Sequence, residues 1–391
     1  MVETIIQNLE SHLANLQSIE SKGIGASIYR IPEHIMNVNP NAFKPKLVSF
    51  GPYHHGELHL MPMEKKKHEA LWYFKKSCRG LTTEKIVSGL WNMLGDLQGS
   101  YDKLDDKWKK EPLKFLELMI LDGCLIMHIF LEDKYLLKFN NVDVQRDMLL
   151  LENQLPMMLL DKLYSILKPG KNKFVMHPLN VKSLVWESDS VGTGAMEKDY
   201  LHLLDMYRWE LNINVLPRWS KLQVSHLGTS HEIRLATRFH KAGIKLEKGW
   251  NLRAVSFDEN KGILSLPFIE MNANIESGLL NAMAFEKLSG IDNIVGSFVV
   301  LMGNLLKKGE VDSFNQLAKG EVLSFLDYYS VYRLVNEHCK RPWRIWWTTL
   351  KDVNFQNPWT IISTLSASIG FVLLILQTVY GMYGYYLPRR S

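Results

Sequence analysis

Residues 361–380 read IISTLSASIGFVLLILQTVY, and they lie inside a longer uncharged stretch from Val353 to Pro388. A helix of about 20 apolar residues rises roughly 30 Å, which matches the hydrocarbon core of a bilayer. Trp359 precedes this run and Tyr380 and Tyr383 end it, so aromatic rings lie where the two membrane–water interfaces would be. A buried core helix is the alternative, but in a soluble protein a helix of this length normally carries a charge. We therefore expect a transmembrane helix over residues 359–387 and a short tail over residues 388–391.

The rest of the chain indicates on which side of the membrane the protein lies. Residues 1–7 contain no basic region, no continuous apolar run and no small-residue cleavage site, so no signal peptide is expected. The chain has no Asn-x-Ser/Thr sequon, and its three cysteines, odd in number and far apart, do not form the pattern of a disulfide framework. We expect a single-pass membrane protein with the bulk of the chain in the cytosol. The plasma membrane is the favoured location, with an endomembrane as the alternative.

Composition sets the broad class of the protein. Hydrophobic residues make up 46% of the 391 residues and charged residues 22%, which is typical of a globular chain with one large or two medium domains. The net charge of +5 suits a surface near anionic lipid but is too small to indicate nucleic acid. No zinc-finger spacing, ribonucleoprotein motif or basic helix is present, so we expect no nucleic-acid partner.

The patterning predicts a mainly α fold, a large helical domain with short β-hairpins. Residues 1–27 are expected to form an N-terminal helix, either packed on the core or binding a partner, and residues 28–352 the helical domain. A polar linker around Pro169-Gly170 marks a candidate sub-boundary over residues 168–191. Leu113–Leu131 is nearly apolar, but its internal charges favour a buried soluble helix over a second span.

Shorter elements are predicted from periodicity and from turn residues. They comprise an amphipathic helix over Lys65–Cys78, a helix capped by Thr82 or Thr83, strands over residues 28–32 and 46–50, an extended loop over residues 33–47, a kink or break at Pro156, a helix near Met196–Trp209, and a hairpin between Asn251–Phe257 and Gly262–Phe268.

The side chains that could act in catalysis or bind a metal do not form a recognised catalytic or metal-binding pattern. Adjacent His54 and His55 point apart in an extended segment with no cysteine nearby, so a metal site is not expected. Asp122 and Glu152 are carboxylates inside apolar runs, and such a group acts either as a general acid or base or as a partner for buried polar atoms. Cys124 is expected to be inert packing. We assign no catalytic, cofactor-binding or metal-binding residue, expect no cofactor, and do not expect an enzyme.

Three basic clusters stand out, at Lys65–Lys67, Lys75–Lys76 and Lys107–Lys110. Such clusters are usually solvated surfaces. In a domain tethered to a membrane they also suit contact with anionic headgroups, at roughly 1 kcal/mol per well-placed charge.

Several strings together resemble the signature of a plant family built on the domain of unknown function 247. They are the runs at residues 28–32, 48–56 (VSFGPYHHG), 121–124 (LDGC), 151–156 (LENQLP), 264–267, 284–286 and 357–359. The resemblance covers nearly the whole chain, although residues 319–327 are shortened and lack the usual glycine-rich connection. It implies a mainly helical domain with one C-terminal span, no established enzymatic activity and no catalytic residues to carry over. It also implies a role in recognition or signalling, such as reproductive self-recognition or development.

Two hypotheses follow. In the first, the protein is a membrane-anchored recognition or signalling module that contacts lipid through its span and binds unidentified protein partners. In the second, it is a membrane-associated enzyme that uses the His54-His55 segment or the carboxylates of Asp122 and Glu152. Convergence of these four residues on one polar pocket would favour the second.

A strip of small residues in the span, Ser363, Ser366, Ala367 and Gly370, also predicts self-association through that helix.

Overall fold

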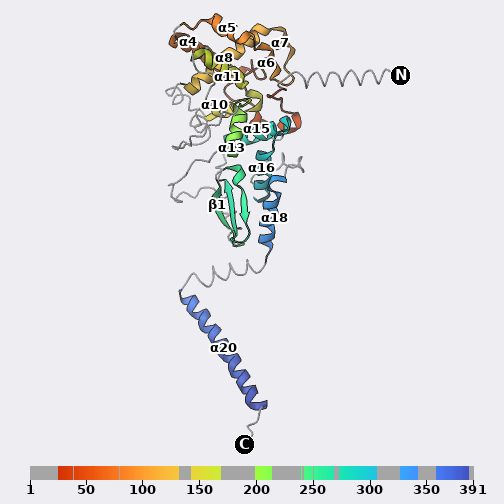
Figure 1. Cartoon of the computed structure of the whole chain (residues 1–391), viewed down its shortest axis with the longest axis vertical. Helices are drawn as coiled ribbons and strands as arrows, with labels where there is room; N and C mark the ends of the chain where they lie inside the picture. The colour runs from red at the N-terminus through yellow and green to blue at the C-terminus, as the bar shows by residue number, and fades with distance from the viewer. Residues whose placement is uncertain are drawn as a thin grey trace, which may run out of the picture. The chain divides into compact units, whose positions relative to one another are not determined.

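The computed structural model describes residues 25–37, 39–78, 80–131, 142–168, 199–213, 239, 242–249, 251–267, 273–305, 326–341 and 358–386. Within these ranges the chain is mainly helical, with one small sheet and one apolar C-terminal helix, so the predicted fold class is confirmed (Figure 1). Most of the N-terminal helix predicted over residues 1–27, and nearly all of the sub-boundary over residues 168–191, lie outside the described residues. The division into domains stays a prediction.

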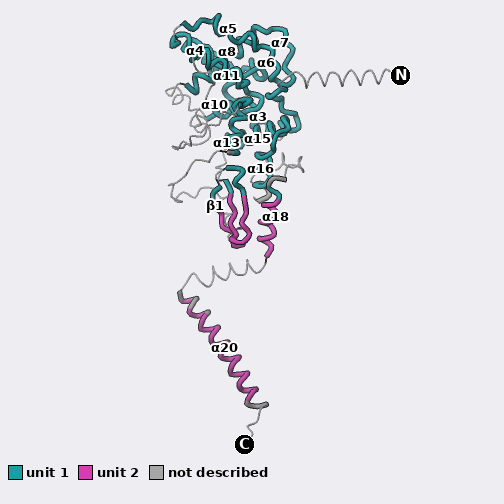
Figure 2. Tube along the Cα trace, viewed as in Figure 1, with its two compact units in different colours: residues 1–226, 248–255, 266–329 teal, residues 227–247, 256–265, 330–391 magenta. Residues whose placement is uncertain are grey.

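The described elements are, in chain order, α2 Glu33–Met36, α3 Pro40–Phe43, η1 Leu58–Met63, α4 Glu64–Ser77, α5 Thr83–Trp91, α6 Leu94–Gly99, α7 Asp106–Lys110, α8 Pro112–Leu131, α10 Val142–Asp147, η2 Leu151–Asn153, α11 Met157–Leu167, α13 Leu203–Ile213, β1 Lys245–Gly249, η3 Leu252–Ala254, β2 Ser256–Asp258, β3 Ile263–Pro267, α15 Ala273–Ser289, α16 Ile294–Leu305, α18 Leu326–Lys340 and α20 Pro358–Tyr386. The η elements are 3₁₀ turns. Two compact units contain them: unit 1 holds residues 1–226, 248–255 and 266–329, and unit 2 the remainder (Figure 2).

Helix α8 is the central helix of unit 1. Every residue from Phe115 to Phe130 except Glu117 is buried, as expected for a core helix in place of a second span. Helices α4 and α11 pack against it. At Gly123 an added Cβ would lie 2.3 Å from Cδ1 of Leu163, so a larger residue there would force the Leu163 side chain to move.

Two predictions for the N-terminal part of unit 1 are wrong. Residues 33–47 are not one extended loop, because the short helices α2 and α3 occupy most of them. Residues 46–50 do not form a strand, since their N–H groups find side chains instead of a neighbouring strand. The Asp147 carboxylate accepts from Lys46, Leu47 and Val48 at 2.7–3.1 Å. The only sheet-like contact of the predicted strand over residues 28–32, among described residues, is a bridge between Ile28 and Tyr101.

Other boundaries follow the sequence more closely. The Thr82 hydroxyl accepts from Lys85 N–H at 3.3 Å and caps α5, as predicted. Pro156 produces a break, because η2 ends before it and α11 begins directly after it. Helix α13 does not follow its prediction as closely: it begins at Leu203, and the predicted start near Met196 lies outside the described residues.

The predicted hairpin forms, and its paired residues 256–265 belong to unit 2. Strands β2 and β3 pair antiparallel with Phe257 opposite Leu264, and the sheet order is β1-β3-β2. The first strand is shorter than predicted, because η3 replaces its beginning. Strand β1 was not predicted, since its sequence, KLEKG, lacks the apolar alternation of a strand.

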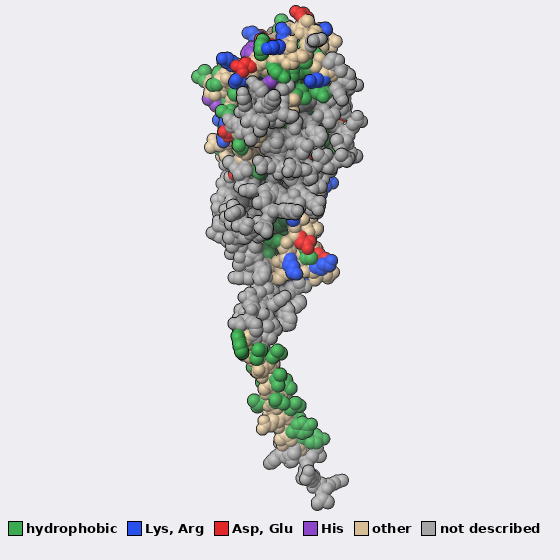
Figure 3. All heavy atoms as spheres, turned by 90° about the vertical axis from the view of Figure 1, so that its left-hand side faces the viewer, with side chains coloured by type: hydrophobic (Ala, Val, Ile, Leu, Met, Phe, Trp, Pro, Cys, Tyr) green, Lys and Arg blue, Asp and Glu red, His purple; other side chains and the backbone are tan. Residues whose placement is uncertain are grey.

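Helix α20 is the element expected to span the membrane. It is 29 residues long, and the 19-residue segment Leu365–Tyr383 is long and apolar enough to cross a bilayer, with none of it buried. Figure 3 shows apolar side chains distributed along this helix and no charged ones.

Candidate functional site

The two most specific strings of the sequence lie against each other in the core of unit 1. The Asn153 side chain accepts from Phe50 N–H at 2.7 Å and donates to the Val48 carbonyl at 3.0 Å. Gly51 has a φ of +75°, and an added Cβ would lie 2.9 Å from the Gln154 carbonyl oxygen. A side chain at Gly51 would therefore be strained and would clash with backbone. The glycine is needed to bring the segment 48–56 against residues 151–156.

Asp122 connects this segment to α4 and α8. Its Oδ2 accepts from Gly51 N–H at 2.7 Å, and its Oδ1 lies 2.6 Å from Nζ of Lys67, with both side chains fully buried. Lys67 also donates to Glu64 at 2.6 Å. Burial raises the pKa of Asp122 to about 6, opposed by the nearby ammonium. Burial would lower the pKa of Lys67, but the attraction of Asp122 raises it, so the two form an ion pair at neutral pH.

Glu152 and His54 form a second buried pair. Glu152 accepts from Ile31 N–H at 2.6 Å through Oε1, and its Oε2 lies 3.3 Å from Nε2 of His54. The other ring nitrogen of His54 lies 2.7 Å from Oε1 of Glu57. Burial favours the neutral imidazole, but the hydrogen bonds with Glu152 and Glu57 outweigh it and raise the pKa of His54.

His55 points to a different neighbour. Its ring packs edge-on against Trp108, with centroids 5.6 Å apart, and burial lowers its pKa. Of the four residues named in the enzyme hypothesis, the structure thus brings His54 and Glu152 into contact. Asp122 is joined to the same segment through Gly51.

These groups are already engaged with backbone and with each other. Asp122 is 0% exposed, Glu152 4% and His54 7%. Each carboxylate accepts a backbone N–H and also faces a basic side chain, which is the arrangement of buried polar groups that fix a loop. The two sequence strings are therefore explained by their role in the fold: their residues hold the segment 48–56 in place.

The described residues contain neither a cluster of metal ligands nor a cysteine in a setting that would make its thiol reactive. No group of three His, Cys, Asp or Glu side chains lies close enough there to hold a metal ion. Cys124 is buried, and burial raises its pKa to about 12, far from the thiolate form that reacts or binds metal.

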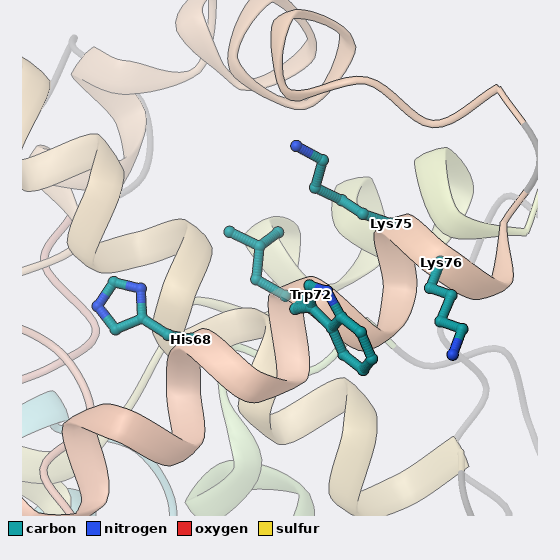
Figure 4. A pocket seen from close by; sticks show the side chains of 5 residues that line it. His68, Trp72, Lys75 and Lys76 are labelled. Carbon is teal, nitrogen blue, oxygen red and sulfur yellow. The ribbon is translucent and has the colours of Figure 1, made fainter.

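The exposed side of α4 carries a shallow, open pocket of about 400 Å³ lined by His68, Leu71, Trp72, Lys75 and Lys76 (Figure 4). Trp72 is 62% exposed. Sequence reasoning identified the lysines but not the tryptophan, although Trp72 lies four residues after His68 and three before Lys75, on one side of the helix. The expectation that all of Lys65–Lys67 form a solvated surface is wrong for Lys67, which is buried with Asp122.

Comparison with known proteins identifies the family. The model of DUF247, described as a plant protein of unknown function, matches residues 28–312 and 307–373. A UPF0481 protein of Arabidopsis thaliana is 27% identical over 427 aligned residues, which cover 92% of this chain and 86% of that protein. No solved structure matches. The chain therefore belongs to the plant family of unknown function DUF247.

Proposed function

We propose that the chain is a single-pass membrane protein that presents its helical domain as an interaction module for recognition or signalling. The observation that carries this proposal is the apolar segment Leu365–Tyr383, none of which is buried. An exposed, mainly apolar segment of 19 residues on a folded chain needs a nonaqueous environment, and a bilayer provides one of matching thickness.

The buried polar groups support an interaction module over an enzyme. Asp122, Glu152 and His54 hold the segment 48–56 in place, and their atoms are engaged with Gly51, Ile31, Lys67 and Glu57. A catalytic role would require a substrate to displace these contacts in the core. The membrane-associated enzyme is therefore the weaker alternative.

Sidedness, location and physiological role are part of the same proposal. The missing sequons and disulfide framework favour a cytosolic domain, at the plasma membrane or, alternatively, an endomembrane. Recognition in reproduction or development, the role that the family resemblance implies, is the field in which we propose to look for partners.

Alkaline carbonate extraction of the full-length protein tests the anchor. Leu373→Asp with Ile375→Asp should release the protein from membranes, because each aspartate at the centre of a span costs roughly 3 kcal/mol. The matched control, Leu373→Val with Ile375→Val, should remain in the pellet. Retention of the aspartate variant would contradict the anchor.

Proximity labelling in plant membranes tests the interaction module. A biotin ligase on the full chain should label proteins that the same ligase on residues 353–391 alone does not. Identical labelled sets would mean that the helical domain recruits nothing, and the interaction part of the proposal would fail.

A further inference from the structure

Five exposed residues form one side of α4: Lys65, His68, Trp72, Lys75 and Lys76, called here the α4 face. Their spacing of three and four residues places them in a single stripe about 16 Å long at 1.5 Å rise per residue. Figure 4 shows His68, Trp72, Lys75 and Lys76 projecting from the helix around the open pocket.

Three lysines of the α4 face have no carboxylate at ion-pair distance among the described residues, although Glu69 and Glu84 lie near enough to interact with Lys65 and Lys75. Helix α4 has five lysines and two glutamates. Lys67 is paired with Asp122 and Glu64, and Lys66 with Glu69 at 2.7 Å. No ion pair within the described ranges involves Lys65, Lys75 or Lys76. Their contacts with Thr83 and Trp72 are to neutral groups, so these exposed ammonium groups can still contact an external anion.

Trp72 gives the α4 face an apolar centre between cations. Lys76 Nζ lies 5.0 Å from the centroid of the indole ring, and Lys75 donates to the hydroxyl of Thr83 at 2.9 Å. An exposed indole costs free energy in water, and it prefers an environment with one apolar and one wet side. A tryptophan flanked by lysines is thus the chemistry that suits a bilayer surface, with the ring below the headgroups and the ammonium groups at the phosphates.

We infer that the α4 face binds anionic lipid headgroups of the membrane in which the protein is anchored. This inference rests on the proposed function, because the anchor raises the local concentration of lipid and makes a weak surface contact effective. An acidic polypeptide offers the same negative charge, but the proposed anchor holds the chain at a lipid surface, so lipid is the occupant that we propose.

The test uses the full-length protein in nanodiscs of neutral phosphatidylcholine or of phosphatidylcholine with phosphatidylserine. An amine-reactive reagent followed by mass spectrometry reads the reactivity of each lysine. Lys75 and Lys76 should react about fivefold more slowly in the anionic discs, since each lysine at an anionic surface gains about this factor. High salt should remove the protection. Lys103, whose side chain is 79% exposed, is the internal reference.

Matched variants test the role of the indole. Trp72→Ala should reduce the protection of both lysines, whereas Trp91→Ala, which removes another exposed tryptophan from α5, should not. Because both side chains are exposed, both variants should fold.

Each outcome separates the two proposals. Equal lysine reactivity in neutral and anionic discs that both contain the inserted protein would overturn the lipid site and leave the anchor intact. Failure to insert into either disc would overturn the anchor and this inference with it. Protection by added polyglutamate but not by anionic lipid would assign the α4 face to an acidic protein and overturn the lipid site.

Discussion

At the scale of single residues, buried side chains accept hydrogen bonds from backbone N–H groups that, in a sheet, a neighbouring strand would accept. Asp147 and Asn153 accept from the N–H groups of Lys46, Leu47, Val48 and Phe50, and Asp122 accepts from that of Gly51. Buried N–H groups without partners would each cost roughly 1–3 kcal/mol, so these few side chains decide whether the segment can be buried at all.

Lys67→Met tests the most deeply buried of these contacts. The change leaves Asp122 without its cation in a site with no solvent exposure. We expect the free energy of unfolding to fall by roughly 3–5 kcal/mol, as when one partner of a buried pair is removed. Urea denaturation of the detergent-solubilised protein, followed by tryptophan fluorescence, measures it.

A second variant distinguishes charge from packing. Lys67→Met combined with Asp122→Asn should recover part of the loss, because asparagine is neutral and still accepts from Gly51 N–H. A double variant no more stable than Lys67→Met would show that the lost packing of the lysine, and not the unpaired charge, dominates.

At the scale of elements, helices with an apolar face could be predicted from the sequence, and segments without one could not. The helical period located α4, and the nearly apolar run located α8, each to within one residue at either end. For α11 the sequence predicted only the break at Pro156 that precedes it. The strand predicted over residues 46–50 failed because its partners, Asp147 and Asn153, lie about 100 residues later, and no local pattern records such a pairing. Strings such as GPYHHG could be recognised as distinctive, but their structural role required the contacts.

Glu286 on α15 caps the start of α16, and its titration makes stability depend on pH. Its carboxylate accepts from Val295 and Gly296 N–H, yet burial raises its pKa to about 7 from an ordinary 4.5. Between these values the folded state keeps a proton that the unfolded state has lost. The contribution of Glu286 to the free energy of unfolding therefore falls as pH rises from about 4.5 to 7, by up to roughly 3 kcal/mol.

Comparison with Glu286→Gln isolates this contribution. His202 acts in the opposite direction, because burial lowers its pKa to about 4 and its contribution rises with pH up to about 6.5. The difference between wild type and Glu286→Gln cancels that background, so the difference should change steadily between pH 5 and 7 in favour of the variant. Parallel curves would show that Glu286 does not titrate in this range.

Helix α20 provides a prediction about pairing between spans. An added Cβ at Gly370 meets no atom within 4 Å, so the chain itself does not require glycine there. Lipid gives no hydrophobic drive for helix association, and small residues allow close backbone contact. Ser366→Leu with Gly370→Leu should weaken self-association of the isolated span in a membrane two-hybrid assay. Ile369→Leu with Val372→Leu, the control away from the strip, should not, and an unchanged signal in the first variant would leave the helix without a pairing role.

At the scale of the whole molecule, the proposal requires that the helical domain and the C-terminal tail lie on opposite sides of one membrane. The bulk of the chain precedes α20, and residues 387–391 follow it. Positive charges near the two ends of the span, Arg341, Arg344 and Lys351 against Arg389 and Arg390, are too evenly balanced to decide the direction by themselves.

Protease protection of sealed microsomes determines the direction. The full-length protein carries different epitopes at its two ends. Protease added outside should remove the N-terminal epitope and leave a small fragment of about 4–5 kDa that carries the C-terminal one. This fragment is protected because α20, at about 1.5 Å of rise per residue, is long enough to remain inside the bilayer. Detergent should abolish this protection. A protected full-length chain would place the helical domain in the lumen, where sequons and disulfides are permitted but not required. In that case the α4 face would meet the luminal leaflet, and its lysines would contact anionic lipid only if that leaflet contains it.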